Sequence, residues 1–222
     1  MGILSGQEIY KEIKCGNIKI DPFNEDRLNP NSYNLRLDDH IKVYDPAKTA
    51  NARKLRDYYG KITYIDKDAW NFHVETDNGR LVGINDAYLD LHERDETEDI
   101  YIGVDDGIIL YPNKLYLGTT IERTWTNKYV PILNGRSSVG RKGLTIHVTA
   151  GFGDIGFDGK WTLEMTVVHP LKVYFADEIC QIAYFSVDGA TDYQYNGRYQ
   201  GQDDVIESRF DEMKKGMFTG DV

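Results

Sequence analysis

The feature that most constrains the fold is a series of short apolar segments that follow one another closely from Ile108 onward. In chain order they read IILYP, LYLGTTIERTW, GLTIHVTAG, KWTLEMTVV and LKVYFADEICQIAYFSV. Segments of strand length with turn residues between them are typical of an antiparallel barrel or sandwich. The 16 tyrosines and 21 glycines of the 222-residue chain favour the same class. We therefore predict a mainly β protein.

The first residues of the chain predict one short helix. Ser5 is placed to cap it, and Glu8 completes a capping box three positions later. Gly16 is placed to end the helix, and Ile9 and Ile13 lie on its apolar face.

Two regions differ from the series of strands. Residues from about 45 to 99 contain short β-like runs and read as an insertion or β arm, with Asp77-Asn78-Gly79 as a strong hairpin turn. The C-terminal tail is polar, and residues 203–216 predict a last helix. Because 41% of the residues are hydrophobic, the chain can bury a sizeable core. We expect one domain over residues 1–222, with the insertion at about 45–99 and a tail at about 188–222.

The charge and the cysteines exclude several classes of protein. A net charge of −10 argues against a protein that coats nucleic acid, but leaves room for a small phosphorylated ligand. Cys15 and Cys180 are too few for a disulfide framework or a four-ligand zinc site. The start of the chain lacks a secretory signal, and no apolar run approaches membrane-spanning length. We expect a cytoplasmic protein that binds neither nucleic acid nor membrane.

Two neighbouring segments each carry a polar face. In GKWTLEMTV, Glu164 alternates with Leu163 and Met165, and in GLTIHVTAG, His147 alternates with Ile146. Two adjacent strands of this kind can line one polar pocket. Taken alone, Glu164 reads as a solvated carboxylate. His147 reads as a hydrogen-bonded structural residue, because nothing nearby orients it for a Ser-His-Asp relay.

Two familiar chemistries fail on their own requirements. His73-Val74-Glu75 matches half of the signature of zinc-dependent nucleoside deaminases, but the other half needs a pair of cysteines, and Cys180 has no partner. The stretch GRSSVGRKG, residues 135–143, suits either phosphate binding or an ordinary turn. It lacks the pattern G-x-x-x-x-G-K-[ST], so it does not form a P-loop.

Four stretches of the chain, taken together, resemble one family. The stretches are NPNSYNLRL, GRSSVGRKGLTIHVTAGFGDIGFDGKWTLEM, ICQIAYF and YNGRYQGQ. They are similar to segments of the dCTP deaminase family, the deaminating branch of the trimeric dUTPase-like fold. The resemblance covers about residues 1–45 and 105–209. It implies a distorted antiparallel β-barrel or jelly-roll of the dUTPase-like type, with a short N-terminal helix and an inserted β arm.

The resemblance also implies a set of functional residues. Glu164 matches the catalytic glutamate, and Arg141 and Ser137 are expected to hold it and the reacting water. The residues implied in substrate binding are Ser138 and Arg136 on the loop, Ala150 and Asp154 near the base and the deoxyribose, and Tyr195, Arg198 and Gln202 on a tail that covers the triphosphate. No side chain is expected to ligate a metal. The same resemblance implies that Mg²⁺ binds with the nucleotide phosphates, that zinc has no role, and that the protein is a homotrimer. It also implies dTTP as a candidate feedback inhibitor.

The predicted reaction is zinc-independent hydrolytic deamination of dCTP to dUTP, in which Glu164 takes a proton from water and passes it on. Phe152 in TAGFGD is similar to members that continue to dUMP and pyrophosphate, so this second step stays open. Asp203 and Asp204 would repel a triphosphate unless they turn away from it or reach the metal, which keeps dCMP as an alternative substrate. A plain dUTPase and a non-catalytic nucleotide-sensing module also stay open.

Overall fold

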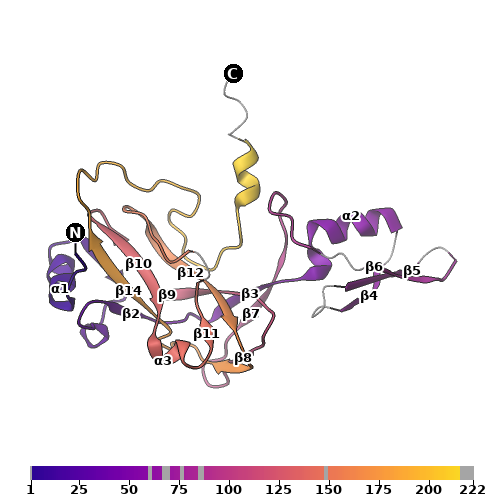
Figure 1. Cartoon of the computed structure of the whole chain (residues 1–222), viewed down its shortest axis with the longest axis horizontal. Coiled ribbons are helices and arrows are strands. Elements are labelled where there is room, and N and C mark those ends of the chain that lie inside the picture. Colours follow the sequence, from indigo (N-terminus) through magenta and orange to yellow (C-terminus); the bar gives the residue numbers. More distant parts are fainter. Residues whose placement is uncertain are drawn as a thin grey trace, which may run out of the picture. The chain divides into compact units, whose positions relative to one another are not determined.

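The chain divides into two compact units (Figure 1). The computed structural model describes residues 2–59, 62–66, 71–75, 78–84, 88–147 and 150–215. Unit 1 comprises Met1–Ile41 and Ile100–Ile206, and unit 2 comprises Lys42–Asp99 and Glu207–Val222. The segment 45–99, which we expected as an insertion, lies within unit 2.

Unit 1 is built mainly from strands. The residues of β3 (His40–Tyr44) and β7 (Thr97–Tyr101) are divided between the two units. The other strands are β1 (Ile18–Asp21), β2 (Tyr33–Leu35), β8 (Ile108–Leu110), β9 (Tyr116–Thr126), β10 (Tyr129–Gly135), β11 (Leu144–Thr145), β12 (Asp158–Val167), β13 (Leu171–Val173) and β14 (Cys180–Ser186). One sheet has the order β11-β12-β9-β3-β7, and β1 also pairs with β9. A second sheet has the order β10-β14-β2, and β13 pairs with β8.

Antiparallel pairing joins β9 to β1 and β12, β14 to β10 and β2, β11 to β12, and β13 to β8. The prediction of a mainly antiparallel β protein with a short N-terminal helix is therefore confirmed. Among the described residues the sheets remain separate, and their strand pairs do not close into a barrel.

The alternation that predicted β12 is visible in the burial of its side chains. Leu163 and Met165 are fully buried, whereas Glu164 on the opposite face is half-buried. Tyr184 of β14 and Leu35 of β2 are also fully buried. Apolar side chains from both sheets thus form the core, whose removal from water is the main favourable contribution to folding.

The N-terminal helix forms where the sequence predicts it. α1 spans Gly6–Lys14, and the Ser5 hydroxyl accepts a hydrogen bond from the Glu8 N–H at 3.2 Å. Gly16 follows with a φ of +77°, a conformation that glycine adopts without strain. The other short helical segments of unit 1 are η1 (Glu25–Arg27) and α3 (Ser137–Gly140). The predicted cap and end of α1 are confirmed.

Unit 2 combines a helix with a small sheet. Its elements are η2 (Pro46–Lys48), α2 (Ala50–Tyr59), β4 (Ile62–Asp66), β5 (Asn71–Glu75), β6 (Leu81–Ile84) and η3 (Phe210–Lys215). β5 pairs with β4 and β6 in antiparallel registers. The expected hairpin thus joins β5 to β6, and Gly79 in its turn has a φ of +74°, while Asp77 lies outside the described residues.

Residues 52–59, which we expected among the β-like runs, belong instead to α2. Two side chains satisfy the first N–H groups of this helix: Thr49 Oγ1 accepts from the Ala52 N–H at 3.1 Å, and Asp95 Oδ1 accepts from the Ala50 N–H at 2.7 Å. Helix starts need such acceptors because their first N–H groups have no partner within the helix. Asp95 is 45 residues away in sequence, so local patterns did not reveal this cap.

The helix predicted over residues 203–216 is wrong for residues 203–209, whereas Phe210–Lys215 form η3 and residue 216 lies outside the described residues. The residues before η3 bind β12 instead. The Ile206 N–H donates to Thr162 Oγ1 at 3.4 Å, and Val205 is buried. Backbone groups that bond to a neighbouring strand are not available to form a helix.

Candidate functional site

The basic loop is a single helical turn that follows a strand. β10 ends at Gly135, and α3 spans Ser137–Gly140. The side chains of Ser137, Ser138 and Arg141 are exposed. The Arg141 N–H donates to the Ser137 carbonyl at 3.1 Å, which closes the turn. The loop therefore presents two hydroxyls and a guanidinium to solvent, a set of donors that suits a phosphate ligand.

Arg136 makes different contacts from the rest of the loop. Its Nη1 donates to Glu178 Oε2 at 2.7 Å and to the Glu178 carbonyl at 3.2 Å. The guanidinium is therefore held by the segment that leads into β14.

Glu164 lies on the polar face of β12, beside His147. β11 ends at Thr145, which lies opposite Thr166 of β12, and His147 follows two residues later. The charge of Glu164 acts to raise the pKa of His147, so the two side chains are within electrostatic reach. The two polar faces recognised in the sequence therefore meet at this pair.

The imidazole of His147 is the most unusual polar group of the site. Both of its ring nitrogens are buried and have no hydrogen-bond partner among the described residues. Burial lowers the pKa of His147 and outweighs the opposite effect of Glu164. The ring is therefore neutral at pH 7 and offers one donor and one acceptor. Buried polar atoms without partners point to a ligand or water that completes their bonds.

From the sequence, His147 was expected as a hydrogen-bonded structural residue, and this expectation is wrong for the described residues, among which neither ring nitrogen has a partner. The signal that connects it with Glu164 was present, because both residues lie on the polar faces of segments that were expected to be adjacent. What the sequence did not reveal is the register, which depends on how β11 and β12 pair.

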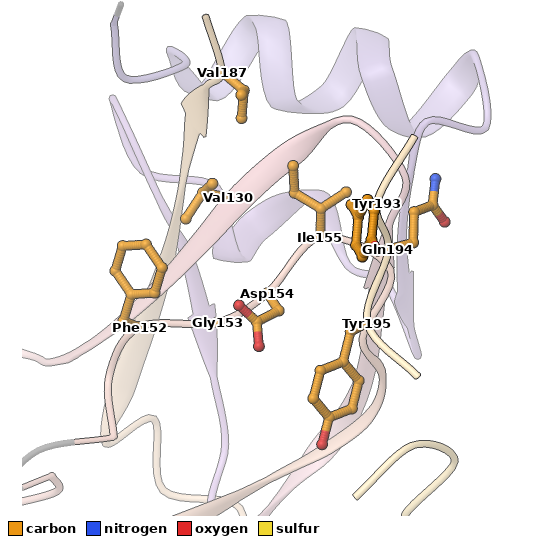
Figure 2. A pocket seen from close by; sticks show the side chains of 9 residues that line it. All are labelled: Val130, Phe152, Gly153, Asp154, Ile155, Val187, Tyr193, Gln194 and Tyr195. Carbon is orange, nitrogen blue, oxygen red and sulfur yellow. The ribbon is translucent and has the colours of Figure 1, made fainter. Parts of the chain in front are cut away.

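A pocket of about 380 Å³ lies where the Gly-rich turn before β12 meets β10 and the tail (Figure 2). Its lining residues are Val130, Phe152, Gly153, Asp154, Ile155, Val187, Tyr193, Gln194 and Tyr195. Figure 2 shows Asp154 between the rings of Phe152 and Tyr195. The turn is held against β10, because the Gly153 N–H donates to the Pro131 carbonyl at 2.9 Å. Asp154 and Tyr195, far apart in sequence, thus share one pocket.

The predicted residues are not all gathered in this pocket. In the part of the chain that the structure describes, Glu164, Ser137 and Arg141 are not among its lining residues. Ala150 is exposed at the start of the Gly-rich turn, and Arg198 is exposed on the tail. Within one chain the predicted site therefore consists of distinct groups: the loop, the Glu164 face and the Asp154 pocket.

Gln202 attaches the tail to β12. Its Nε2 donates to the Lys160 carbonyl and to Thr162 Oγ1, and its own carbonyl accepts from the Lys160 N–H at 2.9 Å. Its side chain is consequently buried, with only 7% of the residue exposed. In this structure, Gln202 is a docking residue within its own chain.

The two acidic residues that follow Gln202 are both paired. Asp203 forms an ion pair with Arg123, and Asp204 Oδ2 lies 2.8 Å from His40 Nδ1. Arg123 also donates to Asp158 at 2.7 Å, and this hydrogen bond is the largest cause that raises the pKa of Arg123. Asp203 and Asp204 are thus turned onto partners of the same unit.

The described residues also bear on metals and membranes. No three His, Cys, Asp or Glu side chains among them come together as a group that could hold a metal ion. None of the described helices is long and apolar enough to cross a membrane. His73 and Glu75, the half of a zinc signature noted in the sequence, lie on β5 in unit 2.

Known proteins with similar sequences cover nearly the whole chain. A family model for dCTP deaminase-like proteins matches residues 3–82 and 72–187. A "dCTP deaminase, dUMP-forming" of Clostridium botulinum (strain Eklund 17B / Type B) is 44% identical over 206 residues, which are 93% of this chain and 95% of that protein. A protein of the same name from Leptospira biflexa serovar Patoc (strain Patoc 1 / Ames) is 38% identical over 206 residues, 93% of this chain and 94% of that protein.

Among solved structures, the 2'-deoxycytidine 5'-triphosphate deaminase of Agrobacterium tumefaciens aligns with a TM-score of 0.47 and 17% identity, over 82% of this chain and 47% of that one. At these values the alignment supports no inference about this chain. The family match is more informative, because its second stretch, residues 72–187, contains the loop, His147, Asp154 and Glu164. The tail residues Tyr195, Arg198 and Gln202 lie beyond it.

Proposed function

The chain belongs to the dCTP deaminase-like family, and from this premise we propose that it hydrolyses the amino group of dCTP and releases dUMP as its nucleotide product. The observation that carries the proposal is the 44% identity, over 93% of the chain, with a protein named "dCTP deaminase, dUMP-forming". The electrostatic effect of Glu164 on His147 and the exposed basic loop support it.

Deamination exchanges the C4–N bond of cytosine for a C4–O bond. A water attacks C4, its protons are taken up and delivered to ring N3 and to the leaving amine, and ammonia departs. We assign the proton transfers to Glu164, a half-buried carboxylate on the polar face of β12, because one positioned carboxylate can act as base and then as acid. His147 is neutral because burial lowers its pKa, so it can orient the water through a hydrogen bond without adding charge.

The nucleotide's phosphates require local positive charge in a chain whose net charge is −10. Arg141 and Lys142 supply it on the exposed loop, and the Ser137 and Ser138 hydroxyls add hydrogen-bond donors. We assign Arg141 and Ser137 a second role in holding Glu164 and the developing charge. Arg136 contributes to the same basic region, although one of its nitrogens is already bound by Glu178.

The base and the sugar need a different environment from the phosphates. We propose that the pocket around Asp154 and Tyr195 takes the deoxyribose, because it combines apolar walls with few polar groups. The backbone near Ala150 would contact the base. Arg198 and Gln202 would lie on the tail that covers the triphosphate, with Gln202 anchoring that tail to β12.

The two acidic residues of the tail, which in the sequence kept dCMP open as a substrate, have partners in the structure. Asp203 and Asp204 are paired with Arg123 and His40 within the chain. Carboxylates that are already engaged by cationic or nitrogen donors repel a neighbouring triphosphate less than free ones. This pairing supports dCTP over the dCMP alternative.

Formation of dUMP from dCTP requires a second hydrolysis, in which water attacks a phosphorus and pyrophosphate leaves. Mg²⁺ bound to the triphosphate would neutralise charge in such a step. Mg²⁺ commonly binds through substrate phosphates with one or two carboxylates and keeps several waters. The described residues contain no three-residue group that could hold an ion by itself, which fits an ion that arrives with the nucleotide. We further propose that zinc has no role.

We also propose that the protein acts as a homotrimer whose sites are shared between subunits. The Asp154 pocket of one chain is lined by neither Glu164 nor the loop, in the residues that the structure describes, so a second copy would have to complete it. Regulation by dTTP and a cytoplasmic location are proposals that rest on the family resemblance alone.

Product analysis tests the proposed reaction. The purified protein is incubated separately with dCTP, dCMP and dUTP in the presence of Mg²⁺, and the products are resolved by anion-exchange chromatography. We expect dCTP to yield ammonia, dUMP and pyrophosphate. Turnover of dUTP alone would show a plain dUTPase, and dUTP as the final product of dCTP would remove the second step. Binding without turnover would show a nucleotide sensor.

The variant Glu164→Gln tests the assignment of the proton carrier. The substitution is nearly isosteric but removes the base, so ammonia release should be abolished while nucleotide binding is retained. Glu8→Gln is a matched control, because Glu8 is paired with Lys11 on α1, away from the proposed site. Substantial residual deamination by Glu164→Gln would show that another group carries the proton.

A further inference from the structure

The motif NPNSYN has no part in the reaction proposed above, yet the structure connects it to the basic loop. Asn34 Nδ2 donates to Glu178 Oε2 at 2.9 Å, and Asn29 Nδ2 donates to Asn34 Oδ1 at 2.7 Å. Ser32 Oγ donates to Gln181 Oε1 at 2.8 Å. These side chains form a polar network between β2 and the start of β14, with Glu178 at its end nearest the loop.

The sheet β10-β14-β2 places this network beside the point where the loop begins. Gly135, the last residue of β10, pairs with Cys180, which pairs in turn with Leu35. One residue further along, the Arg136 N–H donates to the Ile179 carbonyl at 3.2 Å. The loop therefore leaves β10 directly next to the segment that carries Glu178.

Glu178 binds the first side chain of the loop through its carboxylate and its backbone. Arg136 Nη1 donates to Glu178 Oε2 at 2.7 Å and to the Glu178 backbone carbonyl at 3.2 Å. Asn34 donates to the same Oε2 atom. Arg27 Nε lies 3.4 Å from the other carboxylate oxygen. One carboxylate thus lies between two guanidiniums, so the group as a whole keeps a positive charge while Arg136 is held in place.

The turn that follows Arg136 depends on such an anchor. α3 has four residues, and Arg136 at its N-cap provides no side-chain cap hydrogen bond. A single helical turn is not stable by itself, because nucleation costs more than its few hydrogen bonds return. Whatever holds Arg136 therefore also sets the direction in which Ser137 and Ser138 project.

We propose that Glu178 is a positioning residue that acts through Arg136 to hold the loop of residues 135–143 in the orientation that binds the nucleotide's phosphates. Its kinetic consequence rests on the proposed function, whereas its effect on the loop does not. Glu178 contacts no substrate in this scheme. The opposite role, a carboxylate that competes with phosphate for Arg136, predicts tighter nucleotide binding when Glu178 is neutralised, so the two roles differ in sign.

The first experiment measures the loop in the ligand-free protein and needs no activity. Hydrogen exchange of the amides of Val139, Gly140 and Arg141, which bond back to the start of the turn, is compared between wild type and Glu178→Gln. We expect about fivefold faster exchange or more in the variant. Glu8→Gln, which removes a helix ion pair in α1, should leave these amides unchanged.

The second experiment measures steady-state kinetics with dCTP. Glu178→Gln should raise KM about tenfold, the effect of losing one charge-assisted hydrogen bond, and should change kcat less than about threefold, because saturating nucleotide reorders the loop. Arg136→Gln should have a similar effect, and Glu178→Gln should add little to it in the double variant. Glu178→Asp, which keeps the charge on a shorter side chain, should fall between wild type and Glu178→Gln.

The outcomes separate the inference from the proposed function. Faster exchange in the loop, together with a raised KM that is not additive with Arg136→Gln, supports the positioning role. Unchanged exchange, a lowered KM, or additive effects of the two substitutions would each overturn it. If the wild type does not turn over dCTP, the proposed function fails, and the exchange experiment alone decides whether Glu178 anchors the loop. Should Glu178→Gln fail to fold, Glu178→Asp provides the same exchange comparison.

Discussion

Glu122 on β9 provides a test of how the core of unit 1 is held together. Its side chain is fully buried, and its two carboxylate oxygens accept from Arg36 Nε at 2.7 Å and from the Arg36 N–H at 2.8 Å. The Arg36 side chain is itself only 18% exposed. Replacing Glu122 with Gln keeps the shape but leaves a mostly buried guanidinium without its counter-charge.

The expected cost follows from this burial. Removing one partner of a buried ion pair typically costs 3–5 kcal/mol, and the remaining access of Arg36 to water points to the lower end, about 3 kcal/mol. For a chain of this length each kcal/mol shifts Tm by about 2–4 °C, so Glu122→Gln should lower Tm by about 6–12 °C. The slope of unfolding free energy against urea should not change, because the folded state keeps its compactness.

The assay is urea unfolding followed by intrinsic fluorescence at one fixed protein concentration, since assembly would shift the apparent stability. Asp203→Asn is the matched control, because Asp203 pairs with Arg123 at the surface and its side chain is 74% exposed. Surface pairs contribute about 1 kcal/mol or less. If Glu122→Gln loses no more stability than Asp203→Asn, the buried pair does not stabilise the fold as argued.

Three further predictions concern the tail, the histidine and metals. Gln202→Ala removes two side-chain hydrogen bonds to β12, which together contribute about 2 kcal/mol. Hydrogen exchange of the tail amides should therefore become about 30-fold faster. Unchanged exchange would show that Gln202 does not hold the tail. Burial lowers the pKa of His147 from 6.5, so below about pH 6.5 the unfolded chain binds a proton that the folded chain does not, and the free energy of unfolding should decrease as pH falls. His147→Asn should flatten this dependence, measured by urea midpoints between about pH 7 and 5, and parallel profiles would count against it. Deamination should survive thorough zinc chelation once Mg²⁺ is restored; a loss that only zinc repairs would restore the zinc alternative.

Part of the fold was predictable because it depends on residues that are close in sequence. The alternation of Leu163, Glu164 and Met165 predicted both the strand and its two faces, which the burial of β12 confirms. Ser5 and Glu8 predicted the start of α1, since a cap is a contact across three residues. The helix expected over residues 203–216 failed in its first half for the opposite reason: Ile206 bonds to Thr162 of β12, 44 positions earlier in the chain.

The candidate site shows the same division. The composition of residues 135–143 indicated a loop able to bind phosphate, and the structure exposes Ser137, Ser138 and Arg141 there. The roles of these residues toward a nucleotide stay a prediction. Their assignment rests on matching positions to a family, and neither the strand register nor the pocket could be read from that match.

By itself, the sequence determined the mainly β class, the N-terminal helix, the position of the hairpin at Gly79 and the polar faces that carry His147 and Glu164. Each of these follows from side-chain periodicity or from a turn residue, which act over a few positions. Only the tertiary structure decided that Arg136 is held by Glu178, 42 residues away, and that Arg36 is neutralised by Glu122, 86 residues away. Such pairs depend on which strands lie side by side, because a buried or half-buried charge takes whatever partner the folded chain brings within hydrogen-bond distance.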